Sequence, residues 1–238
     1  MLQEIRYALR TLMHAPSFTA SAVLTLAVGI ALNTLVFTLL DSLALRPMPV
    51  RDPARVVRIF PIDARGQRQN LFSYPDYLEY RAAPGPLQGI AAYIPVTITA
   101  RFSGDEAQDL VGYAVSSSYF PLLGIEPSRG RPFSAEEERP GAVSAVAVIS
   151  DSLWRRRFAA SGRVLGERIV LNDRAFTIIG VGPERFMGTE PLSADVWVPI
   201  GAQPIVAPEG DLLHDRQSHW LAGLHRRLRS VPLQPLCR

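Results

Sequence analysis

The longest apolar run of the chain lies close to its N-terminus. Residues 15–40 contain no Asp, Glu, Lys, Arg or His, and residues 18–40 read FTASAVLTLAVGIALNTLVFTLL. As a helix, these 23 residues reach roughly 35 Å, enough to cross a hydrocarbon core about 30 Å thick. The pattern therefore predicts a transmembrane helix over residues 17–40 and makes the lipid bilayer the first expected partner.

A secretory signal peptide is the alternative interpretation of this run. Arg6 and Arg10 supply a basic start, and the small residues at 42–44 would suit a cleavage site. The apolar region of a signal peptide usually has about 7–15 residues and follows the basic start closely. Here the run is longer and begins eight residues after Arg10, which favours a retained helix.

The residues on either side of the run carry different patterns. In residues 1–16, apolar side chains recur at helical spacing, which predicts an amphipathic segment lying along the membrane surface. Arg46, Arg51, Arg55 and Arg58 follow the run within about 20 residues, and a count of positive charges would place the larger part of the chain in the cytoplasm. Long folded segments are translocated largely regardless of charge. The charges alone therefore leave the sidedness open.

After the run, short strand patterns alternate with short helix patterns. There is no regular series of βαβ units, so the fold class expected here is α+β, with a mixed sheet in one domain or two small lobes. The predicted strands are 56–60, 89–101 in two pieces interrupted by Pro95, 110–115, 143–149, 168–171, 175–179 and 195–200, and the predicted helices are 74–81, 119–123 and 151–159.

Cap and turn residues mark the ends of several of these elements. Ser73 and Ser150 are expected N-caps, and Ser116-Ser117 is expected to cap the helix at 119–123, which Gly124 closes. Ser134 with Glu137 three residues later predicts a capping box. The short polar residues at 172–174 predict the tight turn of a hairpin.

Recognisable catalytic and cofactor motifs are missing from the sequence. The chain contains no lysine, so it cannot hold a P-loop, which needs one. Gly180 and Gly182 lack the third glycine of a dinucleotide loop, and we interpret them as a turn. His214, His219 and His225 do not share a helical face, and the single Cys237 offers no metal-ligand pair. We therefore assign no catalytic, cofactor-binding or metal-binding residue and expect no cofactor.

Basic and aromatic residues add little chemistry. All 25 basic residues are arginines, but no basic block is long enough to indicate a nucleic-acid partner. The densest run, residues 155–157, is expected to form the solvated face of a helix whose Trp154 and Phe158 pack near the core. Phe120, Phe133 and Phe186 each lie near a Pro or Gly, and their exposure stays open.

Five separated sequence blocks follow one another along the chain. They are SYPDYLEYR from Ser73, SSSYFPLLGIEPSRGRPFSAEEERPG from Ser116, AVISDSLWRRRFAAS from Ala147, VLGERIVLNDRAFTIIGVGPERF from Val164 and ADVWVPI from Ala194. In this order they resemble the MacB-like periplasmic core domain of ABC-transporter permeases. The resemblance covers about residues 2–225, and its opening is similar to the duplicated-permease branch of that family.

The resemblance implies a bacterial inner-membrane protein that is not an enzyme. Residues 1–16 would be cytoplasmic, residues 17–40 would cross the membrane, and residues 41–225 would form the periplasmic core domain. The expected partners are a cytoplasmic ABC ATPase subunit and a second permease subunit in a dimer. The expected role is efflux or the transmission of motion driven by the separate ATPase.

The C-terminal part departs from the family pattern, which continues into three further membrane helices. Residues 226–238 lose the alternating pattern and are rich in Arg and Pro, so we expect an aberrant, disordered tail from a truncated or frameshifted gene. Two functional classes stay open: a component or fragment of an ABC permease, and a single-span membrane-anchored extracytoplasmic binding domain without transport activity. A secreted enzyme would require a cleaved N-terminus.

Overall fold

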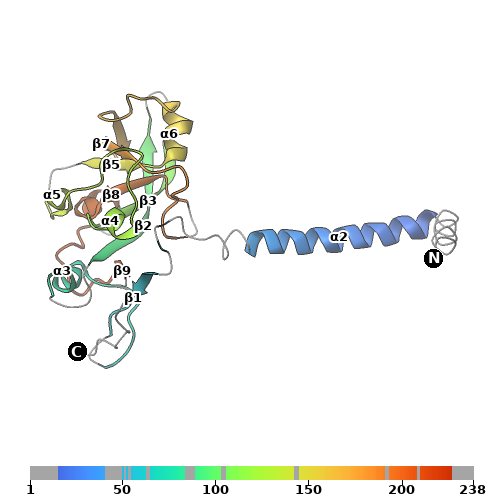
Figure 1. Cartoon of the computed structure of the whole chain (residues 1–238), viewed down its shortest axis with the longest axis horizontal. Coiled ribbons are helices and arrows are strands. Elements are labelled where there is room, and N and C mark those ends of the chain that lie inside the picture. Colours follow the sequence, from blue (N-terminus) through green and yellow to red (C-terminus); the bar gives the residue numbers. More distant parts are fainter. Residues whose placement is uncertain are drawn as a thin grey trace. The chain divides into compact units, whose positions relative to one another are not determined.

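The computed structural model describes residues 16–40, 50, 52, 55–62, 65–83, 89–102, 106–141, 145–190, 193–207 and 210–226. The chain divides into two compact units, residues 1–47 and 48–238, which are shown in Figure 1. The amphipathic segment predicted over residues 1–16 and the tail predicted over residues 226–238 lie outside the described residues, except for Pro16, the first residue of a helix, and Arg226, the last residue of a strand.

The first unit contains α2, Pro16–Leu40, and the predicted apolar helix is confirmed. Large apolar side chains are exposed on every side of this helix, unlike those of a helix with a single apolar face. The hydroxyls of Thr25, Thr34 and Thr38 donate to carbonyl oxygens four residues earlier at 2.7–2.8 Å. Among the described residues, Thr19–Thr38 is the one stretch that could cross a membrane by its length and composition.

The second unit is a mixed sheet of nine strands with short helices around it, as the sequence predicted. The strands are β1 (Val56–Ile59), β2 (Ile90–Arg101), β3 (Gln108–Val115), β4 (Arg129–Gly130), β5 (Val146–Ile149), β6 (Arg168–Leu171), β7 (Arg174–Val181), β8 (Val196–Pro199) and β9 (Ala222–Arg226). The helices are α3 (Tyr74–Ala82), α4 (Tyr119–Leu123), α5 (Ala135–Glu138), α6 (Asp151–Phe158), η3 (Ile200–Ala202) and α7 (Gln203–Val206).

Six of these strands close into a ring. The sheet order is β1-β9-β2-β3-β8-β5-β7-β4, and β6 pairs with both β2 and β7. This second pairing joins the strands in the order β2-β3-β8-β5-β7-β6 and back to β2. The β3–β8 and β5–β7 pairs are parallel, and the other pairs are antiparallel. A small closed barrel of this kind has its interior filled by side chains.

Two apolar clusters lie on the two faces of the ring. The inner cluster takes side chains from all six strands, among them Ile98, Leu110, Ile149, Ile169, Phe176 and Val196. Trp154 and the partly buried Phe158 of α6 pack against it, as predicted. The outer cluster joins Tyr93, Tyr113 and Trp197 to α4 and holds Phe120, Phe133 and Phe186, so these three phenylalanines belong to the core.

The prediction of two extended pieces around Pro95 was wrong, because β2 is continuous. On one side of β2, β9 pairs with Ile90–Tyr93 and β6 with Ala100–Arg101. The backbone N–H of Thr99 points to this side, where it donates to Asn172, and alternation along the strand places the nitrogen of Pro95 on the same side. No described strand pairs there with Pro95, so its missing N–H costs no ladder hydrogen bond.

The turn predicted at Gly180 and Gly182 was wrong for Gly180, which lies inside β7, whereas Gly182 follows the end of that strand. β4 pairs antiparallel with β7 here, with Gly130 opposite Gly180. A Cβ atom on Gly130 would lie 2.0 Å from the carbonyl oxygen of Ile179, and Gly130 has a φ of +74°. The glycines therefore permit the close approach of two backbones, which the sequence pattern alone does not distinguish from a turn.

Most cap predictions are confirmed. Ser73 and Ser150 accept hydrogen bonds from the N–H groups of the first turns of α3 and α6, and Ser134 with Glu137 forms the capping box. The 172–174 turn joins β6 to β7. The cap of α4 was misplaced by one residue: Ser118 is at the N-cap position. Its side chain makes no cap bond, because its hydroxyl donates to the carbonyl oxygen of Ile90 at 2.7 Å.

Replacing Gly130 tests the close approach of the β4 and β7 backbones. Gly130→Ala is expected to lower the free energy of unfolding by about 2 kcal/mol or more, because the left-handed φ costs about 1–3 kcal/mol and the added methyl group collides with Ile179. Chemical denaturation followed by tryptophan fluorescence measures the change. Gly162→Ala is the matched control, since nothing lies within 4 Å of its Cβ position. Equal stability of the two variants would contradict the close approach of β4 and β7 at Gly130.

Candidate functional site

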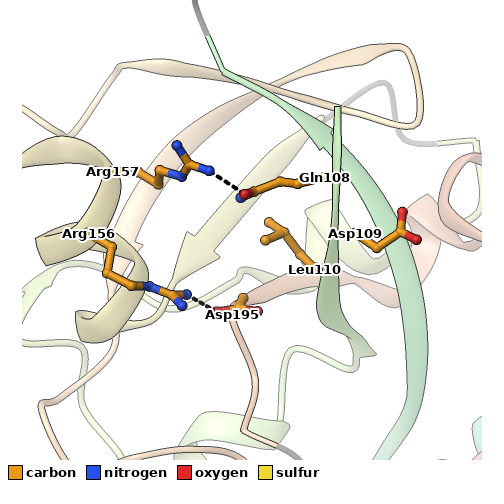
Figure 2. Close-up of a pocket in the computed structure, with 6 residues that line it drawn as sticks. All are labelled: Gln108, Asp109, Leu110, Arg156, Arg157 and Asp195. Atoms are coloured by element: carbon orange, nitrogen blue, oxygen red, sulfur yellow. Dashed lines mark hydrogen bonds and ion pairs between the residues drawn. The ribbon is translucent and has the colours of Figure 1, made fainter. Parts of the chain in front are cut away.

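The first candidate site is a polar pocket between α6 and β3, with a cavity volume of about 290 Å³. Figure 2 shows the side chains of α6 and β3 that face one another across it. Arg156 donates to the carboxylate of Asp195 at 2.6 Å, and Arg157 donates to the side-chain oxygen of Gln108. Asp109 points away from the arginines (Figure 2) and accepts a hydrogen bond from Thr99. The arrangement can hold polar groups by hydrogen bonds.

Asp195 fixes this pocket to the frame of the ring. Its carbonyl oxygen accepts from the N–H of Ser150, the N-cap of α6, at 2.8 Å. Its N–H donates to the carbonyl oxygen of Val111 on β3, and its carboxylate accepts from the N–H of the same residue at 3.3 Å. The arginines of residues 155–157 are exposed, as predicted, but they are anchored by ion pairs and hydrogen bonds.

A second polar site lies around the buried carboxylate of Glu138, which is 1% exposed. Arg81 of α3 donates to one oxygen at 2.8 Å. The N–H and hydroxyl of Ser117 donate to the other oxygen at 3.1 and 2.5 Å. One side chain of α5 thus connects α3 with the loop before α4. Both carboxylate oxygens have donors, so the site satisfies a buried charge and holds the helices in place.

Tyrosines and a loop after β7 form a third polar region. The Tyr93 hydroxyl donates to Glu190 at 2.6 Å, and the hydroxyls of Tyr119 and Thr189 lie 3.1 Å apart. Burial raises the pKa of Tyr93 and of Tyr119, and it raises the pKa of Tyr113 to about 12. These phenols therefore stay protonated near neutral pH and are hydrogen-bond donors there rather than bases.

The three histidines of the described domain lie in different parts of it. His214 binds Asp211 at 3.1 Å, His219 lies 4.0 Å from Asp76, and His225 is buried in β9. Within the described ranges, no group of three or more His, Cys, Asp or Glu side chains could hold a metal ion. The histidines predicted not to share a site therefore lie apart in the described structure.

Comparison with known proteins identifies the family of this domain. A family model described as the MacB-like periplasmic core domain matches residues 19–222. The chain belongs to the MacB-like periplasmic core domain family. It is 29% identical over 102 residues to the macrolide export ATP-binding/permease protein MacB of Sodalis glossinidius (strain morsitans). That match covers 42% of this chain and 15% of the length of the relative.

Solved structures share the fold of this MacB-like domain. The periplasmic region of MacB from Actinobacillus actinomycetemcomitans has a TM-score of 0.57 at 16% identity, over 75% of this chain and 77% of that one. A domain of a putative permease protein from Porphyromonas gingivalis gives 0.53 at 20% identity, with the same coverages. The extracellular domain of the noncanonic ABC-type transporter YknZ from Gram-positive bacteria gives 0.52 at 14% identity, over 72% and 83%.

Two of the blocks that carry the MacB-like resemblance meet at Glu138. The block from Ser73 supplies Arg81, and the block from Ser116 supplies both Ser117 and Glu138. The sequence did not predict this site, since its members are 21 and 57 positions from Glu138. The signal available in the sequence was the run of three glutamates, Glu136 to Glu138, of which only Glu137 was assigned a role, in the capping box.

Substitutions at Glu138 test the buried network. Glu138→Ala is expected to lower the free energy of unfolding by about 2–3 kcal/mol, because Arg81 and Ser117 lose their acceptor. Glu136→Ala on the same helix is the control, since its ion pair with Arg139 is exposed and is expected to contribute about 0.5 kcal/mol or less. Denaturant titration of both variants gives the comparison, and similar losses would refute a structural role for the network.

His225 makes the stability of the domain dependent on pH. Burial lowers the pKa of His225 below its ordinary value of 6.5, although a hydrogen bond with the Gly89 backbone opposes this shift. Its Nδ1 atom is buried without a hydrogen-bond partner among the described residues. The unfolded chain therefore binds a proton at a higher pH than the folded domain does. Folding stability falls as the pH drops below about 6.5, by at most about 1.4 kcal/mol per pH unit for one group.

The measurement is the free energy of unfolding between neutral and mildly acidic pH. His225→Leu is expected to flatten the decline. Because other groups titrate in the same range, the readout is the difference in slope between the variant and the parent chain. An unchanged slope in His225→Leu would remove His225 as the cause.

Proposed function

We propose that the chain is a membrane-anchored periplasmic module of an ABC permease in the bacterial inner membrane. In this proposal α2 crosses the bilayer, residues 1–16 are cytoplasmic, and the ring domain transmits motion between the membrane and a partner outside it. The membership in the MacB-like family and the all-round apolar surface of α2 support this assignment.

The observation that carries the proposal is the pairing of β1 with β9. They are the first and last strands of the domain, and they pair from Val56 opposite Arg226 to Ile59 opposite Gly223. The chain therefore enters and leaves the domain at one end of the sheet. A displacement applied at either connection reaches β9, which pairs directly with β2 of the ring. A densely packed ring moves as one body and is suited to transmitting such a displacement.

The energy for the motion would come from a separate subunit. Because the chain lacks lysine, it cannot bind ATP through a P-loop of its own. A cytoplasmic ABC ATPase is therefore the proposed partner, and a second permease subunit would complete a dimer. Efflux is the proposed direction of transport, by analogy with the macrolide export protein to which the chain is similar.

A second candidate is a single-span anchored domain that binds a molecule outside the cytoplasm without transport. The specific observation in its favour is the polar pocket of Figure 2, whose arginines are held in a fixed orientation by Asp195 and Gln108. This candidate needs the same membrane anchor but no ATPase partner.

Co-purification separates these candidates. The full chain, tagged at its N-terminus, is extracted from membranes in detergent and analysed for intact mass and for an accompanying ATPase, with untagged membranes as the control. We expect an uncleaved chain that brings an ATP-hydrolysing subunit with it. An uncleaved chain alone would favour the second candidate. A mature chain that begins after Ala44 would overturn the membrane anchor, because α2 would then be a signal peptide.

A further inference from the structure

The positive charge of the chain is concentrated just after α2. Residues 46–70 contain six arginines and two aspartates, a net charge of +4, whereas the whole chain has +3. The remaining residues together therefore carry a net charge of −1. This concentration is local in sequence, and the fold decides whether it is also local in space.

Four of these arginines are among the described residues, and they lie in β1 or directly before or after it, at the β1–β9 end of the sheet. Arg58 on β1 and Arg68 in the following loop lie 5.7 and 3.4 Å from the centre of the same ring, that of Phe60. An isolated bridge between Ile62 and Arg68 folds this loop back on itself. We call the set of Arg55, Arg58, Arg65, Arg68 and Arg226 the basic edge.

Carboxylates neutralise only part of the basic edge among the described residues. Asp52 lies 3.7 Å from Arg55 and 3.4 Å from Arg226, and Glu190 lies 3.8 Å from Arg58. Arg65 and Arg68 are exposed, and Arg68 stacks on Phe60, which leaves its charge in place. If Asp63 is counted from the sequence as well, the total is five arginines and three carboxylates.

We infer that the basic edge binds anionic lipid headgroups at the surface of the membrane in which α2 is anchored. The inference rests on the proposed function, because it requires α2 to span the bilayer. Guanidinium groups bind phosphate oxygens through paired hydrogen bonds. A basic segment close to a membrane helix is attracted to anionic lipid with a gain of about five-fold in binding per arginine.

The anchor makes such binding effective even though each contact is weak. Only 15 residues join Leu40 of α2 to Val56 of β1, so the basic edge and the bilayer belong to one tethered system with a high effective concentration. An acidic protein surface would satisfy the same charges, but it would have no such tether. We therefore take the lipid surface as the binding partner of the basic edge, because α2 holds the chain at that surface.

Hydrogen exchange of the full chain in lipid nanodiscs tests the inference. One set of discs contains zwitterionic phosphatidylcholine alone, and the other contains phosphatidylcholine mixed with anionic phosphatidylglycerol. We expect amides in residues 55–70 to exchange more slowly in the anionic discs, and the difference to disappear at high salt, which screens the contact. The double variant Arg58→Gln with Arg68→Gln is expected to weaken lipid binding roughly 30-fold and to abolish the difference.

The matched control is Arg163→Gln with Arg185→Gln, which removes the same charge from exposed positions outside the basic edge. The control is expected to keep the lipid-dependent protection, and unfolding curves of both double variants show whether the fold is intact.

Equal exchange in the two kinds of disc, by a chain that is embedded in them, would overturn the inference but not the membrane anchor. Protection that is independent of lipid charge but lost in the basic-edge variant would indicate a protein neighbour and also overturn it. Failure of the chain to enter discs would instead refute the proposed function.

Discussion

The ring of the second unit depends on how β6 closes against β2. The two strands share only two residue pairs, Ala100 with Leu171 and Arg101 with Val170. Asn172 extends this junction: its N–H donates to the carbonyl oxygen of Thr99 at 2.8 Å, and its side-chain oxygen accepts from the N–H of Thr99 at 2.9 Å. Its amide nitrogen also donates to the carbonyl oxygen of Ile205. Asn172 therefore extends the pairing of β6 with β2 by one residue, at the point where β6 turns into β7.

The same residue shows what local sequence can predict and what it cannot. Asn172 and Asp173 have positive φ angles of 43° and 62°, which short polar residues tolerate, so the hairpin was predictable from its turn. The bonds from Asn172 to Thr99 join residues 73 positions apart. No local pattern contains them, and the sequence therefore predicted a mixed sheet but not a closed ring.

The errors at Pro95 and Gly180 have the same origin. In each case a residue that commonly ends a strand lies inside one, for a reason set by the neighbouring strands. Pro95 faces a gap between β9 and β6, whereas Gly180 lies where the backbone of β4 comes too close to β7 for a side chain. The candidate sites behave likewise, since Arg156 meets Asp195 and Arg81 meets Glu138 only after folding. Helix caps were easier to predict, because the cap side chain and the N–H group that donates to it are three residues apart.

The strand β1 also changes how the charges after α2 should be counted. A count that treats Arg55 and Arg58 as loop charges would place the domain in the cytoplasm. However, the positive-inside rule applies to short loops, and long folded segments largely escape it. Arg58 belongs to β1, and Arg55 immediately precedes that strand and contacts Asp52. Both arginines are therefore part of a folded domain, so these two charges do not count against the proposed periplasmic location.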